Sequence, residues 1–115
     1  MKTGRLLRNG RDLVPRALLA RTWWSRLRGL LLRPPLASDA SEALVLEPCA
    51  SIHTFGMHYR LDVVFVDAEG AVLGVRENVR PWRTCMQRGA RAVIEFHHGA
   101  VRRLSIVPGD RIEWR

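Results

Sequence analysis

The sequence predicts a single α+β domain over residues 1–115, with one N-terminal amphipathic helix packed on a curved, mostly antiparallel, barrel-like sheet. Three observations lead to this fold class. Apolar residues repeat with a helical period over residues 16–33, strand-like apolar runs continue from residue 43 onward, and residues 61–77 show a strand–turn–strand pattern. A chain of 115 residues also has the common size of one domain with one core.

The N-terminal third holds the predicted helix. Residues 1–11 are basic and lack periodicity, which indicates either a frayed arm or a short edge strand. Over 16–33, at about 100° per residue, apolar residues share one arc and arginines fill the other. The apolar arc contains Ala17, Leu19, Ala20, Trp23, Trp24, Leu27, Leu30 and Leu31. Pro34 and Pro35 should end the helix, because a proline moves the residue before it out of the helical region.

Strand signals dominate the remainder of the chain. The clearest is a hairpin whose two apolar runs flank residues 68–70, with Gly70 at the turn. A long connection is expected over 79–89, a helical turn over 100–106, and a tight turn at 108–110. The predicted strands are 43–47, 51–57, 61–67, 71–77, 92–96 and 111–114.

Composition narrows the class of protein and of partner. Hydrophobic residues make up 47% of the chain and charged residues 26%, which excludes a wholly disordered chain. The formal net charge of +8 favours anionic partners, which are nucleic acid, an acidic membrane face or an acidic protein. Arginines interrupt every N-terminal apolar stretch, so we expect neither a secretion signal nor a transmembrane segment. The expected location is the cytoplasm, with Cys49 and Cys85 as reduced thiols.

A series of short motifs in a fixed order resembles a known family. They are Arg28-Gly29-Leu30, Ile52 to Met57, Leu61 to Asp67, Gly70, Val72, Pro81, Val93 to Glu95, Gly99 and Gly109-Asp110. This order resembles the domain of unknown function 192, a family of small uncharacterised bacterial and archaeal proteins. The resemblance implies a compact barrel-like antiparallel sheet with a packed helix, and it implies no established reaction, cofactor or substrate.

The chain departs from one common form of that family. An aromatic-Trp-Met-Lys-Asn-Thr segment there stands in place of Ile52 to Met57 here. Any role tied to that lysine or asparagine is therefore not carried over to this chain.

The leading functional hypothesis is a non-catalytic binding module. Asp62 lies in a nearly all-apolar strand, where a charge is costly unless it is paired, and Arg80 and Arg83 lie in the long connection. We therefore expect Asp62, Arg83 and Cys85, with His53 close by, to border one concave surface, and Trp82 to supply apolar contact. The ligand would be an anionic small molecule, a peptide or a nucleic acid. The competing account is that buried Asp62 and Glu95 only fix strand register and loop shape.

Two alternatives belong to other classes. Cys49, His53, Asp62 and Cys85 contain the parts of a small hydrolytic or thiol-based enzyme, a thiol, a base and an orienting acid. Trp82 between Arg80 and Arg83 combines stacking with charge, which suits nucleic-acid binding without sequence specificity. The cysteines and histidines lack the close spacing of zinc ligands, so we predict no metal and no cofactor. The oligomeric state is not predicted.

Overall fold

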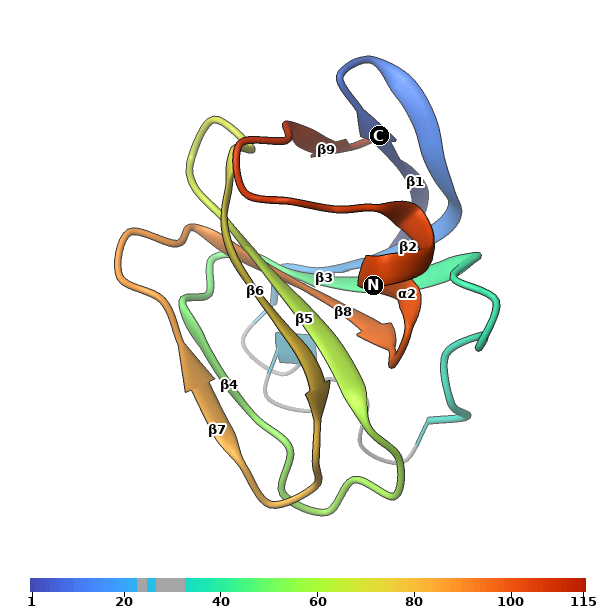
Figure 1. The fold of residues 1–115 in the computed structure, drawn as a ribbon, viewed down its shortest axis with the longest axis vertical. Helices are drawn as coiled ribbons and strands as arrows, with labels where there is room; N and C mark the ends of the chain where they lie inside the picture. Colours follow the sequence, from blue (N-terminus) through green and yellow to red (C-terminus); the bar gives the residue numbers. More distant parts are fainter. Residues whose placement is uncertain (23–24, 27–32) are drawn as a thin grey trace.

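Strands dominate the computed structural model, which describes residues 1–22, 25–26 and 33–115 (Figure 1). Within that part of the chain, the helix with defined ends is α2 (Ala100–Leu104). The strands are β1 (Lys2–Arg8), β2 (Arg11–Ala20), β3 (Glu42–Leu46), β4 (Ser51–His53), β5 (Leu61–Val66), β6 (Val72–Val79), β7 (Thr84–Met86), β8 (Ala92–His97) and β9 (Ile112–Trp114).

The strands form one large sheet and one small ribbon. The sheet has seven strands in the order β6-β5-β8-β3-β2-β1-β9, and β4 pairs with β7 separately. Every pair is antiparallel except β2 with β3. The edge strands approach each other where Ala71 bridges Arg111 and the Val72 N–H donates to the Asp110 carbonyl at 2.8 Å. One bridge is not a ladder, so the described strands form an open, curled sheet, and the expected barrel-like closure is wrong.

The predicted N-terminal helix over 16–33 is wrong in its first part, and with it the α+β class. Residues 11–20 form β2, which pairs with β1 on one side and with β3 on the other. Ala17 and Leu19 are buried. The apolar arc of a helix and the inner face of a strand would both bury them, so the local periodicity could not distinguish a helix from a strand. Pairing with distant strands decided the outcome. Residues 23–24 and 27–32 of the predicted helix lie outside the described residues.

The basic N-terminal segment is a strand and not a frayed arm. β1 lies between β2 and β9, so it is not an edge strand either. Leu6 and Leu7 are almost fully buried and hold it in the core. No helix among the described residues combines the length and apolar character needed to cross a membrane.

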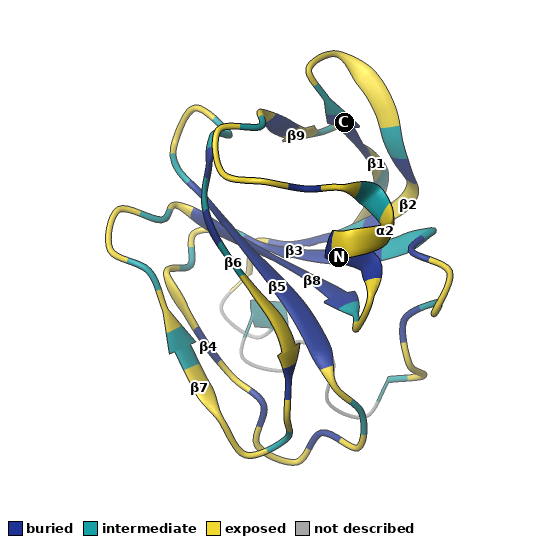
Figure 2. Cartoon of the chain, viewed as in Figure 1, coloured by how far each residue is buried: buried dark blue, intermediate teal, exposed yellow. Residues whose placement is uncertain are grey.

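The core lies on both faces of the sheet. In β5, Leu61, Val63 and Phe65 face one hydrophobic cluster, while Val64 and Val66 face the other. This explains why every residue of the strand except Asp62 is apolar. The β4–β7 ribbon adds Ile52 and Cys85 to the first cluster, and Figure 2 shows the buried central strands beside the largely exposed ribbon.

Candidate functional site

The β4–β7 ribbon has an inner face and an outer face. Ile52 pairs with Cys85, and His53 pairs with Thr84. Residues directly opposite each other in an antiparallel pair point to the same side, and successive residues alternate. Ile52 and Cys85 therefore face the core, while His53 and Thr84 face solvent.

Buried Thr54 fastens the connection after β6 to the end of β4. Its hydroxyl donates to the Arg80 carbonyl at 2.7 Å and accepts the Arg83 N–H at 2.9 Å. Its own N–H donates to the Arg83 carbonyl at 2.8 Å, and its carbonyl accepts the Trp82 N–H at 3.1 Å. Trp82 is thereby held at a φ of 63°, in the left-handed region. Such a conformation costs about 1–3 kcal/mol, so it persists where surrounding contacts hold it.

Three exposed rings form what we call the aromatic strip: His53, Phe55 and Trp82. The His53 and Phe55 ring centroids lie 5.0 Å apart, and those of Phe55 and Trp82 lie 5.5 Å apart with 26° between the planes. The Phe55 N–H also donates to His53 Nδ1 at 3.3 Å. Trp82 is 65% exposed and Phe55 is 43% exposed. Large aromatic surface is therefore presented to solvent in a fixed arrangement.

Two shallow hollows, which together we call the basic track, lie at the same end of β6. Arg76, Arg80 and Arg83 line the first. The second is lined by further cationic side chains, Arg60, Arg102 and Arg103, with His98. Both hollows include Glu77 and Asn78, so they adjoin. Within the described residues, Arg76, Arg80 and Arg83 form no ion pair with a carboxylate. Arg76 lies over the Phe65 ring and donates to Gln87 Oε1 at 3.3 Å, so Arg80 and Arg83 are the charges most available to an anion.

Asp62 does not pair with Arg83. The Asp62 side chain is fully buried and accepts three backbone N–H groups, from Asn78 at 2.8 Å, Gly99 at 3.0 Å and Val101 at 2.9 Å. Neither Asp62 nor Arg83 takes part in an ion pair within the described part of the chain. The carboxylate thus ties the end of β6 and the start of α2 to β5. Asp62 lines the second hollow, and Arg83 and Cys85 line the first.

The parts of the alternative thiol or hydrolytic site are dispersed. His53 lies on the outer face of the ribbon and Cys85 on the inner face, while the Asp62 carboxylate is occupied by backbone donors. The Cys49 thiol donates to the Ser51 carbonyl at 3.0 Å. Burial raises the pKa of both the Cys49 and the Cys85 thiol, which is the opposite of what a nucleophilic thiolate needs. The described residues contain no cluster of three or more metal-binding side chains.

These raised pKa values give a prediction about thiol chemistry. Both cysteines are free, and we expect the native protein to react with iodoacetamide more slowly than an exposed thiol at neutral pH, since the reactive thiolate is scarce. Unfolding should release two equivalents of rapidly reacting thiol. Alkylation rates followed by mass spectrometry across pH test this. An alkylation rate already at its plateau near pH 7 would contradict it and reopen the thiol-enzyme reading.

Thr54 and Phe55 were missed from the sequence. Both sit in a run that predicts a strand over 51–57, where a phenylalanine is expected to be core. The observed strand ends at His53, and a turn containing Gly56 at a φ of 80° follows it. The signal available in the sequence was that glycine, which marks the end of the strand and frees Phe55 to point outward.

The chain is similar to uncharacterised proteins throughout. The family model described as "Uncharacterized ACR", DUF192, matches residues 6–114. A UPF0127 protein of Thermococcus sibiricus is 34% identical over 108 residues, which cover 91% of this chain and 70% of that protein. A UPF0127 protein of Thermococcus gammatolerans is 35% identical over 103 residues, which cover 84% of this chain and 64% of that protein.

Two solved structures share the fold. A protein of unknown function from Novosphingobium aromaticivorans matches with a TM-score of 0.81 and 27% identity, over 97% of this chain and 85% of that one. A protein of Sinorhizobium meliloti matches with a TM-score of 0.84 and 25% identity, over 98% and 94%. The second carries a provisional name as a transcription regulator.

Proposed function

The chain belongs to the uncharacterised DUF192 family, and from its surface we propose that it is a non-catalytic binding protein for single-stranded nucleic acid. In this proposal the aromatic strip stacks against bases, and the arginines of the basic track hold the phosphates. Binding would depend little on base sequence, because every base has a face that can stack on an aromatic ring.

The observation that carries the proposal is the exposed Phe55–Trp82 stack beside three arginines without an ion-paired carboxylate in the described structure. Stacking of a base on an aromatic side chain contributes about 1–3 kcal/mol, and it needs an unstacked base. A single strand offers such bases, whereas a duplex does not. His53 lies on the outer face of the ribbon, and Phe55 and Trp82 lie in exposed segments next to it, so this aromatic surface suits an extended strand better than an enclosed small molecule.

Two further features support the proposal. The net charge of +8 adds attraction for a polyanion through release of its counterions. The similar Sinorhizobium meliloti structure is provisionally named a transcription regulator, a class of protein that acts on nucleic acid. Two free thiols suit a reducing compartment, and we propose the cytoplasm as the location.

The test is the affinity for a fluorescein-labelled oligothymidine of about 12 nucleotides, within the range of small single-strand binding domains. Trp82→Ala should weaken binding about tenfold, measured by fluorescence anisotropy at about 0.15 M salt, because one stacking contact is lost. Trp82→Phe should retain most of the affinity. Val107→Ala, which removes exposed apolar surface on the turn after α2, is the matched control and should change nothing.

The salt dependence separates stacking from charge. Arg80→Ala should lower the slope of log affinity against log salt by about one unit, whereas Trp82→Ala should leave that slope unchanged. If binding disappears near physiological salt and Trp82→Ala has no effect at low salt, the attraction is charge alone and the proposal fails.

A further inference from the structure

The second hollow of the basic track has walls that the fold fixes to one another. It lies between the start of β5, the end of β6 and the turn that leads from β8 into α2. The His98 N–H donates to the Arg60 carbonyl at 3.1 Å, and Asp62 accepts the N–H groups of Asn78 and Gly99. Hydrogen bonds therefore join the three walls, and the backbone that carries the lining side chains is held in place.

Three arginines supply the positive charge of this hollow. Arg60 immediately precedes β5, and Arg102 and Arg103 lie in α2. None of the three forms an ion pair with a carboxylate in the described part of the chain. Arg60 donates to Asn78 Oδ1 at 3.4 Å, a long hydrogen bond to a neutral amide, so the charge of its guanidinium is not neutralised there.

The carboxylates near the hollow reduce this charge without cancelling it. Asp62 lines the hollow, but its two oxygens already accept three backbone N–H groups. Glu77 also lines it, on the side shared with the first hollow. Hydrogen bonds from Ser41 hold the pKa of exposed Asp39 below its ordinary value, and a weaker attraction to Arg103 adds to this effect. Three arginines thus outnumber the two carboxylates that line the hollow.

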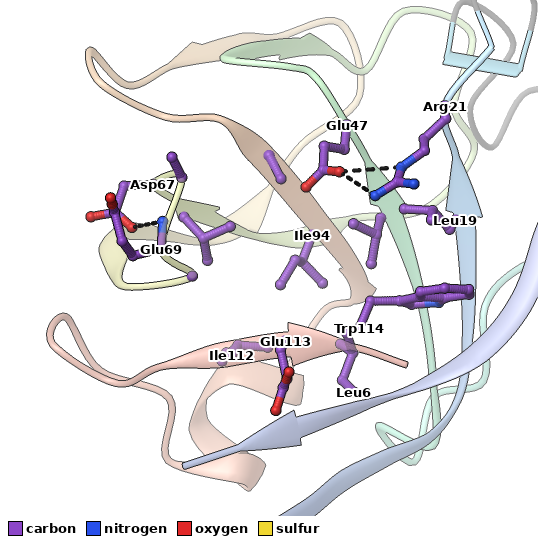
Figure 3. Close-up of a pocket in the computed structure, with 15 residues that line it drawn as sticks. Leu6, Leu19, Arg21, Glu47, Asp67, Glu69, Ile94, Ile112, Glu113 and Trp114 are labelled. Carbon is purple, nitrogen blue, oxygen red and sulfur yellow. Dashed lines mark hydrogen bonds and ion pairs between the residues drawn. The ribbon is translucent and has the colours of Figure 1, made fainter. Parts of the chain in front are cut away.

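Many of the acidic side chains lie at the other end of the β5–β6 hairpin. The turn between these strands follows the end of β5, whereas Arg60 precedes its start. Beside that turn is a cavity of about 250 Å³ (Figure 3). Four of the eleven acidic residues of the chain line it, with one arginine, Arg21: Glu47, Asp67, Glu69 and Glu113. Charge is therefore polarised along the hairpin, and the resulting field draws an anion toward the second hollow.

We propose that the second hollow recognises the terminal phosphate monoester of a bound strand, an inference that rests on the proposed function. A phosphate monoester has a charge of about −1.5 to −2 at neutral pH and three acceptor oxygens, whereas each phosphodiester along a strand has one charge. Guanidinium groups form strong, charge-assisted hydrogen bonds with phosphate oxygens. Arg60 and Arg102 would donate to different oxygens, with Arg103 and His98 beside them. At about 860 Å³, the hollow leaves room for the sugar that carries the phosphate.

The experiment compares three unlabelled oligothymidines of about 12 nucleotides as competitors of the fluorescein-labelled strand. One has a 5′-phosphate, one has a 3′-phosphate, and one has hydroxyl groups at both ends. At about 0.15 M salt, we expect one of the phosphorylated strands to bind about tenfold more tightly than the hydroxyl strand, as for a gained charge-assisted hydrogen bond. The end that gives the gain identifies the direction in which the strand lies. An equal gain from both phosphates would indicate charge alone and would overturn the inference.

Exposed arginine variants assign the gain to the hollow. Arg60→Ala and Arg102→Ala should each remove most of the gain from the terminal phosphate and change the affinity of the hydroxyl strand by less than about twofold. Arg11→Ala is the matched control, because it removes the same charge from an exposed position at the start of β2, outside the basic track. It should leave the gain intact, and an equal loss in this variant would contradict the inference.

The inference and the proposed function fail on different results. If all three strands bind with the same affinity and Trp82→Ala weakens each of them, the hollow does not recognise a terminal phosphate, and the proposed function stands. If Trp82→Ala has no effect on the hydroxyl strand, the proposed function fails, and the inference fails with it.

Discussion

Replacing Asp62 with asparagine is expected to lower the free energy of unfolding by about 2–4 kcal/mol. The two carboxylate oxygens accept three backbone N–H groups in a fully buried position. An asparagine has one oxygen, so its amide nitrogen must face at least one of those donors and leave it without a partner. Hydrogen bonds to a charged group contribute about 1.5–3 kcal/mol each, and a buried unsatisfied donor adds its own cost. Urea unfolding followed by circular dichroism measures the difference.

The same variant decides between the two roles that the sequence left open for Asp62. If the carboxylate is an anchor, Asp62→Asn should lose stability but bind the oligonucleotide normally at temperatures where it stays folded. Asp12→Asn is the control, because Asp12 is an exposed acid 3.7 Å from Arg5 and should change stability by less than about 0.5 kcal/mol. A stable Asp62→Asn protein with impaired binding would assign Asp62 to the ligand.

The strands that could be predicted are those whose signals are local. The turn between β5 and β6 is an example: Asp67 accepts the N–H groups of Glu69 and Ala71, and Gly70 has a φ of 83°. All of these residues lie within five positions of one another, so the short sequence pattern contains the whole explanation.

The helix predicted over 16–33 was wrong in its first part because that segment is held by contacts with residues far away in the sequence. β2 pairs with β3 in parallel, and Arg16 lies opposite Glu42 with a 2.9 Å ion pair between their side chains. That pairing joins residues 26 positions apart, and it satisfies backbone groups that a helix would have satisfied internally. Ala17 and Leu19 suit both structures, so their hydrophobicity could not choose between them.

The candidate site divides in the same way. The predicted connection over 79–89 is wrong in part, because Val79 belongs to β6 and Thr84–Met86 form β7. Its proline, arginine and tryptophan did indicate an exposed segment, and Trp82 and Arg83 are both exposed. The need of the Asp62 carboxylate for polar partners could also be predicted, because it lies in a nearly all-apolar strand. The sequence could not show which groups donate to Asp62. Gly99 and Val101 come close to Asp62 only in the folded chain, and they donate backbone N–H groups, which almost every residue has. The convergence of His53, Asp62, Arg83 and Cys85 on one surface stays a prediction.

Glu95 should make the protein less stable as the pH rises from about 5 to about 8. It lies in β8 opposite Leu44 and Val63, is 5% exposed, and its side chain forms no ion pair or hydrogen bond within the described residues. Burial raises the pKa of this carboxyl from 4.5 to about 7. Below the pKa of 4.5 that the carboxyl has in the unfolded chain, the folded and the unfolded protein both hold the proton. Between 4.5 and about 7 the unfolded chain has released the proton and the folded protein still holds it, so stability falls as the pH rises through this window.

The size of the effect follows from the width of that window, about 1.4 kcal/mol for each pKa unit and therefore about 3 kcal/mol in total. Other groups also titrate here, so the quantity to measure is the difference in unfolding free energy between the native sequence and Glu95→Gln. That difference should shift in favour of the variant by about 3 kcal/mol between about pH 5 and about pH 8, because glutamine has no proton to lose. Glu77→Gln, an exposed control, should show no such shift. A difference that stays constant with pH would mean that Glu95 ionises near its ordinary pKa, as it would beside a cation, and the position would then be an ion pair in the core and not a neutral acid.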